Sequence, residues 1–514
     1  MDGVSTTRET TCGAVRGSRT GDVVSWKGIP FAAPPVGPLR FAPPEPAVPW
    51  EGVRDGSRYG AASLQHPGFP TPLVQDVVQS EDCLNLNVWA PATAEPRGRA
   101  VLVWIHGGAY LGGSGAEYWS DGTNLAGQED IVVVSVNYRL GALGGLALDE
   151  AGTLGNNFLL DVVQALRWVR DNIAAFGGDP DRVTIGGQSA GAMIVAALVA
   201  SPYAHGLFHA AIVQSGHGTG NAPRASAHRA RDLVVSELGI ARDDHMMERL
   251  LAADVADLIR AQQKAAEEMI TPFKPVTDGD ILPLPVIGLF AAATQQSVPL
   301  LLGTTRDEHN LFAAMGWGHG TGQVTPLRER LEQVLIDPEP AVVEELIAVY
   351  QELARSDGLD WNPDDAAWNI LRTDLDWRGP QRDLAAFHAD IGAPVYRYEF
   401  AFRTPVDGGV LGAAHALDIP FVFGNLDQPG MAARTGDDVA SPARRKVAAQ
   451  CTQAWGSFVR DGRPESQHLP QWPRYERDRQ EIMVLGSEPM VVTDPHVQRL
   501  DVWKKLATIP PLSS

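Results

Sequence analysis

The chain has 514 residues, of which 44% are hydrophobic and 20% charged, so a large buried core can form without disulfide or metal cross-links. Its formal net charge of −20 at pH 7 repels nucleic acid and anionic membrane surfaces, and no basic stripe with interleaved aromatic residues opposes this repulsion. No apolar run reaches the ~18 residues of a membrane span, and residues 1–30 lack a signal-peptide core. We therefore expect a cytoplasmic protein with no nucleic-acid or membrane partner.

No Pro/Gly/Ser-rich linker, charge block or internal repeat divides the chain. We expect residues 1–514 to form a single domain of the α/β class, with a mostly parallel central sheet flanked by helices. Residues 222–270 and 325–393 are rich in Ala, Arg, Glu and Leu at helical spacing, which predicts two helical insertions that cap the sheet.

The first strong strand signal is at residues 101–105, which lead into His106-Gly-Gly-Ala-Tyr110. This segment resembles the HGGG loop of esterases, whose backbone N–H groups stabilise the oxyanion formed when a serine attacks an acyl carbon. Gly107 and Gly108 are therefore candidate oxyanion-hole residues. A second buried strand is predicted at 131–136, and an amphipathic helix at 159–173.

The most informative local pattern is TIGGQSAGAM at residues 184–193, which predicts a strand, a G-x-S-x-G turn and a helix. A serine on such a sharp turn has strained backbone angles, and the flanking glycines allow strand and helix to approach closely. Ser189 is therefore the candidate nucleophile of a hydrolase. The N–H group of Ala190, the next residue, is a candidate oxyanion donor.

Downstream, residues 210–214, 299–303 and 395–400 predict further strands of the same sheet, and 443–460 a final helix. The strand at 300–304 leads directly into Arg306-Asp-Glu-His309, which places two carboxylates at the carboxyl end of a strand. A serine nucleophile needs a histidine base that is oriented by a carboxylate, and α/β hydrolases carry them in the order serine, acid, histidine. Asp307 and Glu308 both suit the role of the acid.

The candidate base is His415, on a small-residue loop ahead of the apolar segment IPFVFG at 419–424. The residues alone do not separate His415 from His217 or His388.

Ordered motifs along nearly the whole chain resemble the type-B carboxylesterase/lipase family, which includes bacterial para-nitrobenzyl esterases, mammalian carboxylesterases and cholinesterases. The motifs are GIPFAAPPVG (28–37), SEDCLNLNVW (80–89), NYRLG (137–141), AFGGDP (175–180) and PFVFGN (420–425). The resemblance implies an α/β-hydrolase fold with a triad of Ser189, Glu308 and His415. It also implies an oxyanion hole of Gly107, Gly108 and Ala190, and ion pairs joining Arg40 to Glu81 and Arg139 to Asp161.

Three positions depart from the family pattern. Gln188 stands where the family usually has a glutamate, which removes a charge that would favour cationic transition states. Leu73 stands near the place of the indole that binds quaternary ammonium groups in cholinesterases, so a cholinesterase is disfavoured. His309 replaces the family's glycine after the acid, and we interpret it as a wall residue rather than a base.

Met193, Leu311 and Phe312 are near the nucleophile or the acid in sequence, and they line an apolar acyl pocket or serve as ordinary core residues. The run GWGHGTG at 316–322 has glycine at every second position, which is typical of a mobile flap near the site or of a surface loop.

Three cysteines, Cys12, Cys83 and Cys451, are too few and too widely spaced for a disulfide framework or a zinc site. We expect buried structural thiols, and a cysteine nucleophile is the rival interpretation.

The sequence thus predicts a serine carboxylesterase that hydrolyses small-molecule esters through an acyl-enzyme intermediate, without a metal or organic cofactor. One alternative is an amide or carbamate hydrolase with the same triad. Another, from a different class, is a non-catalytic interaction module that retains the fold. A monomer is expected, although the sequence does not determine the oligomeric state.

Overall fold

A computed structural model describes residues 5–503 except 67–76, 93–97, 153, 270, 317–324, 337–338, 359–360, 437 and 439–440. Leu73 and most of the predicted glycine-rich flap, residues 317–322, lie outside the described residues.

The described part of the chain is built around an 11-stranded sheet with the order β14-β13-β12-β11-β10-β9-β7-β8-β6-β4-β3. Strands from β13 to β8 run parallel. At one edge β14 pairs antiparallel with β13, and at the other edge β6, β4 and β3 pair antiparallel with one another and β6 with β8. The strands are β3 (Ser18–Thr20), β4 (Val23–Pro30), β6 (Asn85–Pro91), β7 (Arg99–Ile105), β8 (Val132–Val136), β9 (Gly178–Gln188), β10 (Ala210–Gln214), β11 (Leu300–Thr305), β12 (Val395–Phe400), β13 (Glu481–Leu485) and β14 (Met490–Thr493). A small separate sheet contains β1 (Thr7–Thr10), β2 (Gly13–Arg16) and β5 (Val53–Asp55).

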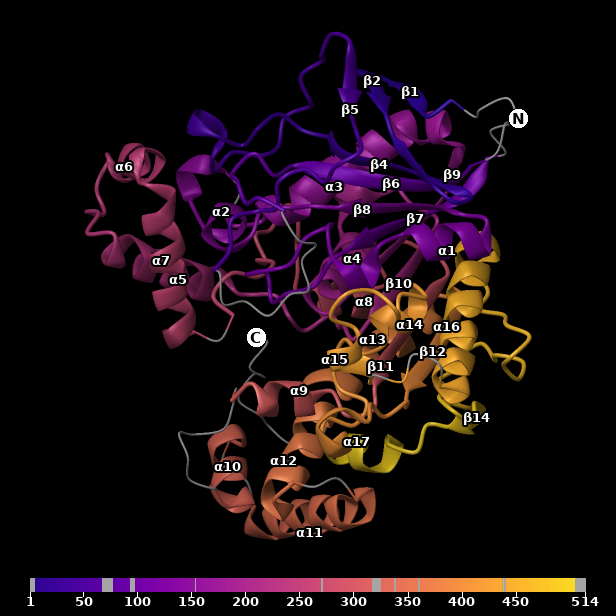
Figure 1. The fold of residues 1–514 in the computed structure, drawn as a ribbon. Coiled ribbons are helices and arrows are strands. Elements are labelled where there is room, and N and C mark those ends of the chain that lie inside the picture. The colour runs from indigo at the N-terminus through magenta and orange to yellow at the C-terminus, as the bar shows by residue number, and fades with distance from the viewer. Residues whose placement is uncertain are drawn as a thin grey trace.

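Helices cover both faces of the large sheet (Figure 1), so its central strands are apolar on both sides. In β7, Val103 and Ile105 pack into the core on one face, while Leu102 and Trp104 pack into the core on the other. The first face is covered by α3 (Asn157–Asn172), α4 (Ala190–Ala200), α8 (Val286–Ala291) and α13 (Gly379–Asp390). The second is covered by α1 (Thr123–Glu129), α14 (Ile419–Val422) and α16 (Pro442–Asp461).

Two groups of helices lie away from the sheet (Figure 1). One contains α5 (Arg224–Glu237), α6 (Met246–Ala252) and α7 (Val255–Glu268), and the other α10 (Leu327–Val334), α11 (Pro340–Asp357) and α12 (Pro363–Thr373). The remaining helices are short: α2 (Gly141–Gly145), α9 (His309–Ala314), α15 (Ala432–Thr435), α17 (Val497–Trp503), the π-helix η6 (Asp374–Arg378), and the 3₁₀ helices η1 (Gly37–Leu39), η2 (Tyr118–Ser120), η3 (Asp149–Ala151), η4 (Ile173–Phe176), η5 (Pro202–Ala204) and η7 (Val406–Gly409). None of the described helices is long and apolar enough to cross a membrane.

The elements predicted from residue 100 onward are confirmed, with β10 and β12 at the predicted residues and α3 and α16 within two residues of them. The sequence did not predict the antiparallel strands at the two edges of the sheet. Both expected ion pairs form. Arg40 Nε donates to Glu81 Oε1 at 2.6 Å, and Arg139 Nη2 donates to Asp161 Oδ1 at 2.6 Å.

The cysteines are free thiols, and the expectation of burial is correct for two of the three. Cys83 and Cys451 are buried, and burial raises the pKa of the Cys83 thiol to about 12. Cys12 is only partly buried because it lies in a surface turn between β1 and β2, so the prediction was wrong for this residue.

Candidate active site

Ser189 occupies a sharp turn at the carboxyl end of β9, directly before α4. Its backbone has φ 56° and ψ −126°, a conformation that costs about 1–3 kcal/mol for a non-glycine residue. The turn is possible because β9 and α4 are in close contact here: a Cβ on Gly187 of β9 would lie 2.6 Å from the carbonyl carbon of Gly191 in α4. The local sequence therefore dictates the strained turn that the G-x-S-x-G pattern predicted.

The loop after β7 approaches the same serine from the neighbouring strand. A Cβ on Gly107 would lie 3.1 Å from Ser189 Cβ and 2.7 Å from the carbonyl oxygen of Gln188, so only glycine allows the backbone this close. Gly108 follows with φ +114°, and Ala190 begins α4, where backbone N–H groups have no intrahelical acceptor. Of the three predicted oxyanion-hole residues, Gly107 and Ala190 thus adjoin Ser189, and Gly108 is the next residue of the loop after Gly107.

Contacts of His106 stabilise the start of the glycine loop. Its ring stacks on Tyr138 at a centroid distance of 4.4 Å, and Tyr138 Oη donates to the His106 carbonyl oxygen at 2.8 Å. Burial lowers the pKa of His106 to about 4, so its imidazole is neutral at neutral pH. A neutral, stacked ring fixes the loop without placing a cation beside the serine.

Glu308 lies three residues beyond the end of β11 and is fully buried. Its Oε1 accepts hydrogen bonds from the Thr305 N–H group at 2.8 Å and from Ser215 Oγ at 2.6 Å. The remaining oxygen, Oε2, lies 2.5 Å from Nδ1 of His415. Two donors therefore satisfy one carboxylate oxygen and direct the other at the histidine.

His415 lies on the loop between β12 and α14, and its two ring nitrogens have different partners. Because the Glu308 carboxylate accepts from Nδ1, the proton is on Nδ1 and the Nε2 lone pair is free to accept. The side-chain amide nitrogen of Gln188 lies 3.0 Å from Nε2 and donates to it. This is the tautomer that a general base requires.

Within the described residues, no hydrogen bond joins Ser189 Oγ to His415. The structure therefore brings Glu308 and His415 into direct contact and places Ser189 one residue from the group that contacts Nε2.

Aromatic rings form one wall beside His415. Phe312 and Trp377 stack on each other at 5.7 Å with 10° between their planes, and their centroids lie 5.0 Å and 4.5 Å from the imidazole. His217 contacts the edge of Trp377 at 5.8 Å. Both rings therefore pack against the imidazole at a tilt of about 45°.

The structure distinguishes between the three histidines that the sequence alone could not rank as the candidate base. His388 is buried, and its Nε2 bonds the Val298 carbonyl oxygen at 2.7 Å, away from the serine. His217 is near the wall, where burial and the charge of Lys274 lower its pKa to about 3. It contacts neither carboxylate of the acid loop, and His415 is the histidine that pairs with Glu308.

Asp307 binds backbone instead of histidine. Its Oδ2 accepts from the Ala413 N–H group at 2.7 Å, and its own N–H group donates to the Ala413 carbonyl oxygen at 3.0 Å. It therefore joins the acid loop to the histidine loop. His309 is buried on α9, where its N–H group donates to Thr373 Oγ1 at 3.1 Å, and its ring lies 5.9 Å from Phe312.

The candidate pocket residues differ in position. Met193 is one helical turn beyond Ser189, and a Cβ on Gly220 would lie 2.7 Å from its sulfur. Phe312 and Leu311, neighbours on α9, are both partly exposed. The ring of Phe312 contacts His415.

Sequence reasoning missed two residues of the site, Ser215 and Trp377. Ser215 directly follows the predicted strand 210–214, and the carboxyl end of a central strand was a signal that could have identified it. Trp377 lies within a helical insertion far from any motif, and no local pattern points to it.

A serine elbow at the carboxyl edge of a mostly parallel sheet defines the α/β-hydrolase fold. The model of the carboxylesterase family matches residues 4–503. The para-nitrobenzyl esterase of Bacillus subtilis (strain 168) is 37% identical over 497 residues, covering 95% of this chain and 96% of the relative. The human cocaine esterase is 34% identical over 521 residues, covering 96% and 88%. A crystal structure of a Geobacillus stearothermophilus carboxylesterase superimposes with a TM-score of 0.84 at 38% identity, covering 97% and 100%.

The chain therefore belongs to the carboxylesterase family. It is a serine carboxylesterase, an enzyme that hydrolyses carboxylic esters.

Proposed function

We propose that Ser189, His415 and Glu308 are the catalytic triad of this esterase and that Gly107, Gly108 and Ala190 supply its oxyanion hole. The observation that carries the proposal is the 2.5 Å contact of Glu308 Oε2 with His415 Nδ1, which leaves Nε2 facing the residue next to Ser189. Within this arrangement each group has one chemical task.

The reaction has two steps. His415 Nε2 takes the proton of Ser189 Oγ, which attacks the ester carbonyl carbon, and the N–H groups of the oxyanion hole stabilise the resulting negative oxygen. His415 then protonates the leaving alcohol and leaves an acyl-serine. Water, deprotonated by the same histidine, releases the carboxylic acid and restores the enzyme. Glu308 orients the imidazole and stabilises its charged form.

Met193 and Phe312 line the acyl pocket in this proposal, with Leu311 at its margin. Trp377 is parallel to Phe312, so the pocket has a flat aromatic side next to the base. We propose small-molecule esters as substrates.

The decisive experiment measures hydrolysis of short- and long-chain para-nitrophenyl acyl esters by the wild-type enzyme and by Ser189→Ala. Loss of the nucleophile should lower turnover by about a millionfold. Ser487→Ala, at an exposed serine, is the matched control and should retain full turnover. A para-nitrophenyl carbamate and an anilide tested in parallel show whether the same site also cleaves these bonds. Full activity in Ser189→Ala would refute the triad.

We further propose that the chain is one α/β-hydrolase domain with helical insertions at about 222–270 and 325–393, and that it acts as a monomer in a bacterial cytoplasm. The free thiols support the reducing compartment. The similarity to the Bacillus subtilis esterase supports the bacterial origin. Size-exclusion chromatography with light scattering tests the monomer.

A further inference from the structure

The carbonyl group of Arg306 is bound by the guanidinium of Arg378, whose Nη2 donates to it at 2.9 Å. Arg306 lies at the start of the acid loop, two residues before Glu308. Arg378 is 2% exposed, and its hydrogen bond to Arg306 is partly buried. A buried cation thus contacts the backbone next to the proposed catalytic acid.

Two carboxylates from different elements anchor the guanidinium. Asp374 is one helical turn earlier in η6 and forms an ion pair with Arg378, and Glu399 Oε2 on β12 lies 3.2 Å from Nη2. The Arg499 and Arg378 charges outweigh burial and lower the pKa of Asp374 to about 2, so this carboxylate is ionised at neutral pH. Because its charge is compensated, the guanidinium can hold a neutral carbonyl in a fixed place.

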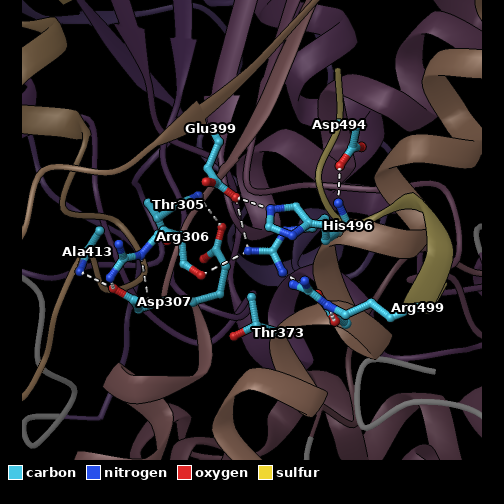
Figure 2. A network of polar contacts seen from close by, with 12 residues as sticks. Thr305, Arg306, Asp307, Thr373, Glu399, Ala413, Asp494, His496 and Arg499 are labelled. Carbon is cyan, nitrogen blue, oxygen red and sulfur yellow. Dashed lines mark hydrogen bonds and ion pairs between the residues drawn. The ribbon is translucent and has the colours of Figure 1, made fainter. Parts of the chain in front are cut away.

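The anchors themselves are fixed by the end of the described chain (Figure 2). His496 Nε2 lies 2.7 Å from Glu399 Oε2, and Arg499 on α17 pairs with Asp374. Glu399 also lies opposite Thr304 in the register of β11 and β12. These ion pairs therefore connect the carboxyl end of β11, the strand that precedes Glu308, to α17.

The same turn of chain also contacts the base. Trp377, the residue before Arg378, packs against His415 at 4.5 Å. Trp377 and Arg378 both belong to the π-helix η6, and π-helices are rare irregularities that often occur at functional sites. One short segment thus contacts the acid loop with a hydrogen bond and the histidine with a ring.

We propose that Arg378 is a positioning residue for ester hydrolysis: by holding the Arg306 carbonyl group, it keeps the Glu308 carboxylate aligned with His415 Nδ1. The inference rests on the triad proposed above. Displacing a catalytic group by about 1 Å can cost on the order of a hundredfold in rate.

The test compares Arg378→Met with Arg382→Met. Arg382 lies one helical turn after Arg378, in α13, and is 4% exposed. It pairs with Asp501 of α17 at 2.9 Å and also donates to the Val497 carbonyl oxygen, away from the acid loop. Both variants lose a buried arginine that is paired with a carboxylate. We expect Arg378→Met to lower kcat by about 10- to 100-fold with KM within threefold, and Arg382→Met to keep kcat within about twofold. Equal kcat values in the two folded variants would overturn the proposal.

A double-mutant cycle separates positioning from a general structural effect. If Arg378 acts through Glu308, adding Arg378→Met to Glu308→Gln should slow that variant by less than about twofold. The same loss in both backgrounds would overturn the proposal. Arg378→Lys, which keeps the charge but not the planar fork, should be intermediate between the wild type and Arg378→Met.

Two further variants keep the outcome interpretable. If Arg378→Met does not fold, Arg378→Met/Glu399→Gln removes one charge of each sign and tests the same contact, with folding measured by circular dichroism. Wild-type kcat in that folded double variant would overturn the proposal. Ser189→Ala tests the proposed triad separately. A wrong triad assignment can therefore be distinguished from a wrong assignment of the positioning role to Arg378.

Discussion

The Nε2 atom of His415 lies 3.0 Å from the side-chain amide nitrogen of Gln188, the residue directly before Ser189. In the proposed triad, the amide donates to the same lone pair that accepts the serine proton. Because the amide nitrogen can only donate, Gln188 binds the tautomer of His415 that has its proton on Nδ1. A glutamate, which the family usually has here, would offer a negative charge instead of this donor.

Gln188→Glu should shift the acid limb of the kcat/KM profile to higher pH by about one unit. The new carboxylate favours the protonated imidazole, which does not act as a base. A pH series with a neutral para-nitrophenyl ester measures the shift. Gln188→Met is the control: it removes the amide donor without adding a charge, so it should shift the limb less than Gln188→Glu does. An equal shift in both variants would contradict the electrostatic explanation.

Gly107→Ala should lower kcat by about 10²- to 10³-fold, the usual effect of losing one oxyanion donor. The added Cβ would lie 2.7 Å from the Gln188 carbonyl oxygen, so the loop must move away from Ser189. Gly288→Ala is the control, because its methyl group would meet no atom closer than 3.8 Å. Steady-state kinetics of both variants test this. A fully active Gly107→Ala would exclude this loop from the oxyanion hole.

Asp418→Asn should stabilise the protein at pH 8 but not at pH 4. Burial raises the pKa of Asp418 to about 6, from an unfolded value near 4. Below pH 4 the Asp418 carboxyl is mostly protonated in both the folded and the unfolded protein, so it does not lower the free energy of unfolding. Above pH 6 its ionisation costs the folded state up to about 3 kcal/mol, which the amide avoids. Gln214 and Tyr398 still have an oxygen to donate to.

Urea denaturation of wild type and Asp418→Asn at the two pH values measures this difference. Asp374→Asn is the opposite control, because the lowered pKa of Asp374 stabilises the folded state at pH 8. Equal gains at both pH values for Asp418→Asn would show that its ionisation is not the cause.

Asp161→Ala should lower the free energy of unfolding by about 3–5 kcal/mol. The variant leaves Arg139 buried at 1% side-chain exposure without its carboxylate. Asp171→Ala removes the partner of Arg170 in an ion pair where both side chains are about half exposed, and the loss there should be under about 1 kcal/mol. Denaturant titration of the two variants tests the contrast, and similar losses would refute it.

The central strands could be predicted because burial on both faces produces continuous apolar runs, as at Val101–Ile105. The two outer strands of the small separate sheet carry no such signal. Residues Val53–Asp55 of β5 are all exposed, and Thr7–Thr10 of β1 are polar. Their pairing depends on tertiary contacts that periodicity does not reveal.

The parts of the candidate site that depend on a short stretch of sequence could be predicted, and the parts that depend on distant segments could not. The elbow at Ser189 is determined within ten residues. The choice of Glu308 over Asp307 needed the family pattern, because both are carboxylates after the same strand. Ser215 and Trp377 reach Glu308 and His415 only through the order of strands in the sheet and the packing of a helical insertion, which no single segment encodes.

The strand order also has a kinetic consequence. Gln188, directly before Ser189, and His415 are 227 residues apart in the chain, and they come into contact only after β9, β10, β11 and β12 have paired in parallel register. Contacts of such long sequence separation close slowly, because much chain entropy is lost before they form. During refolding, hydrolytic activity should therefore return later than helical circular dichroism.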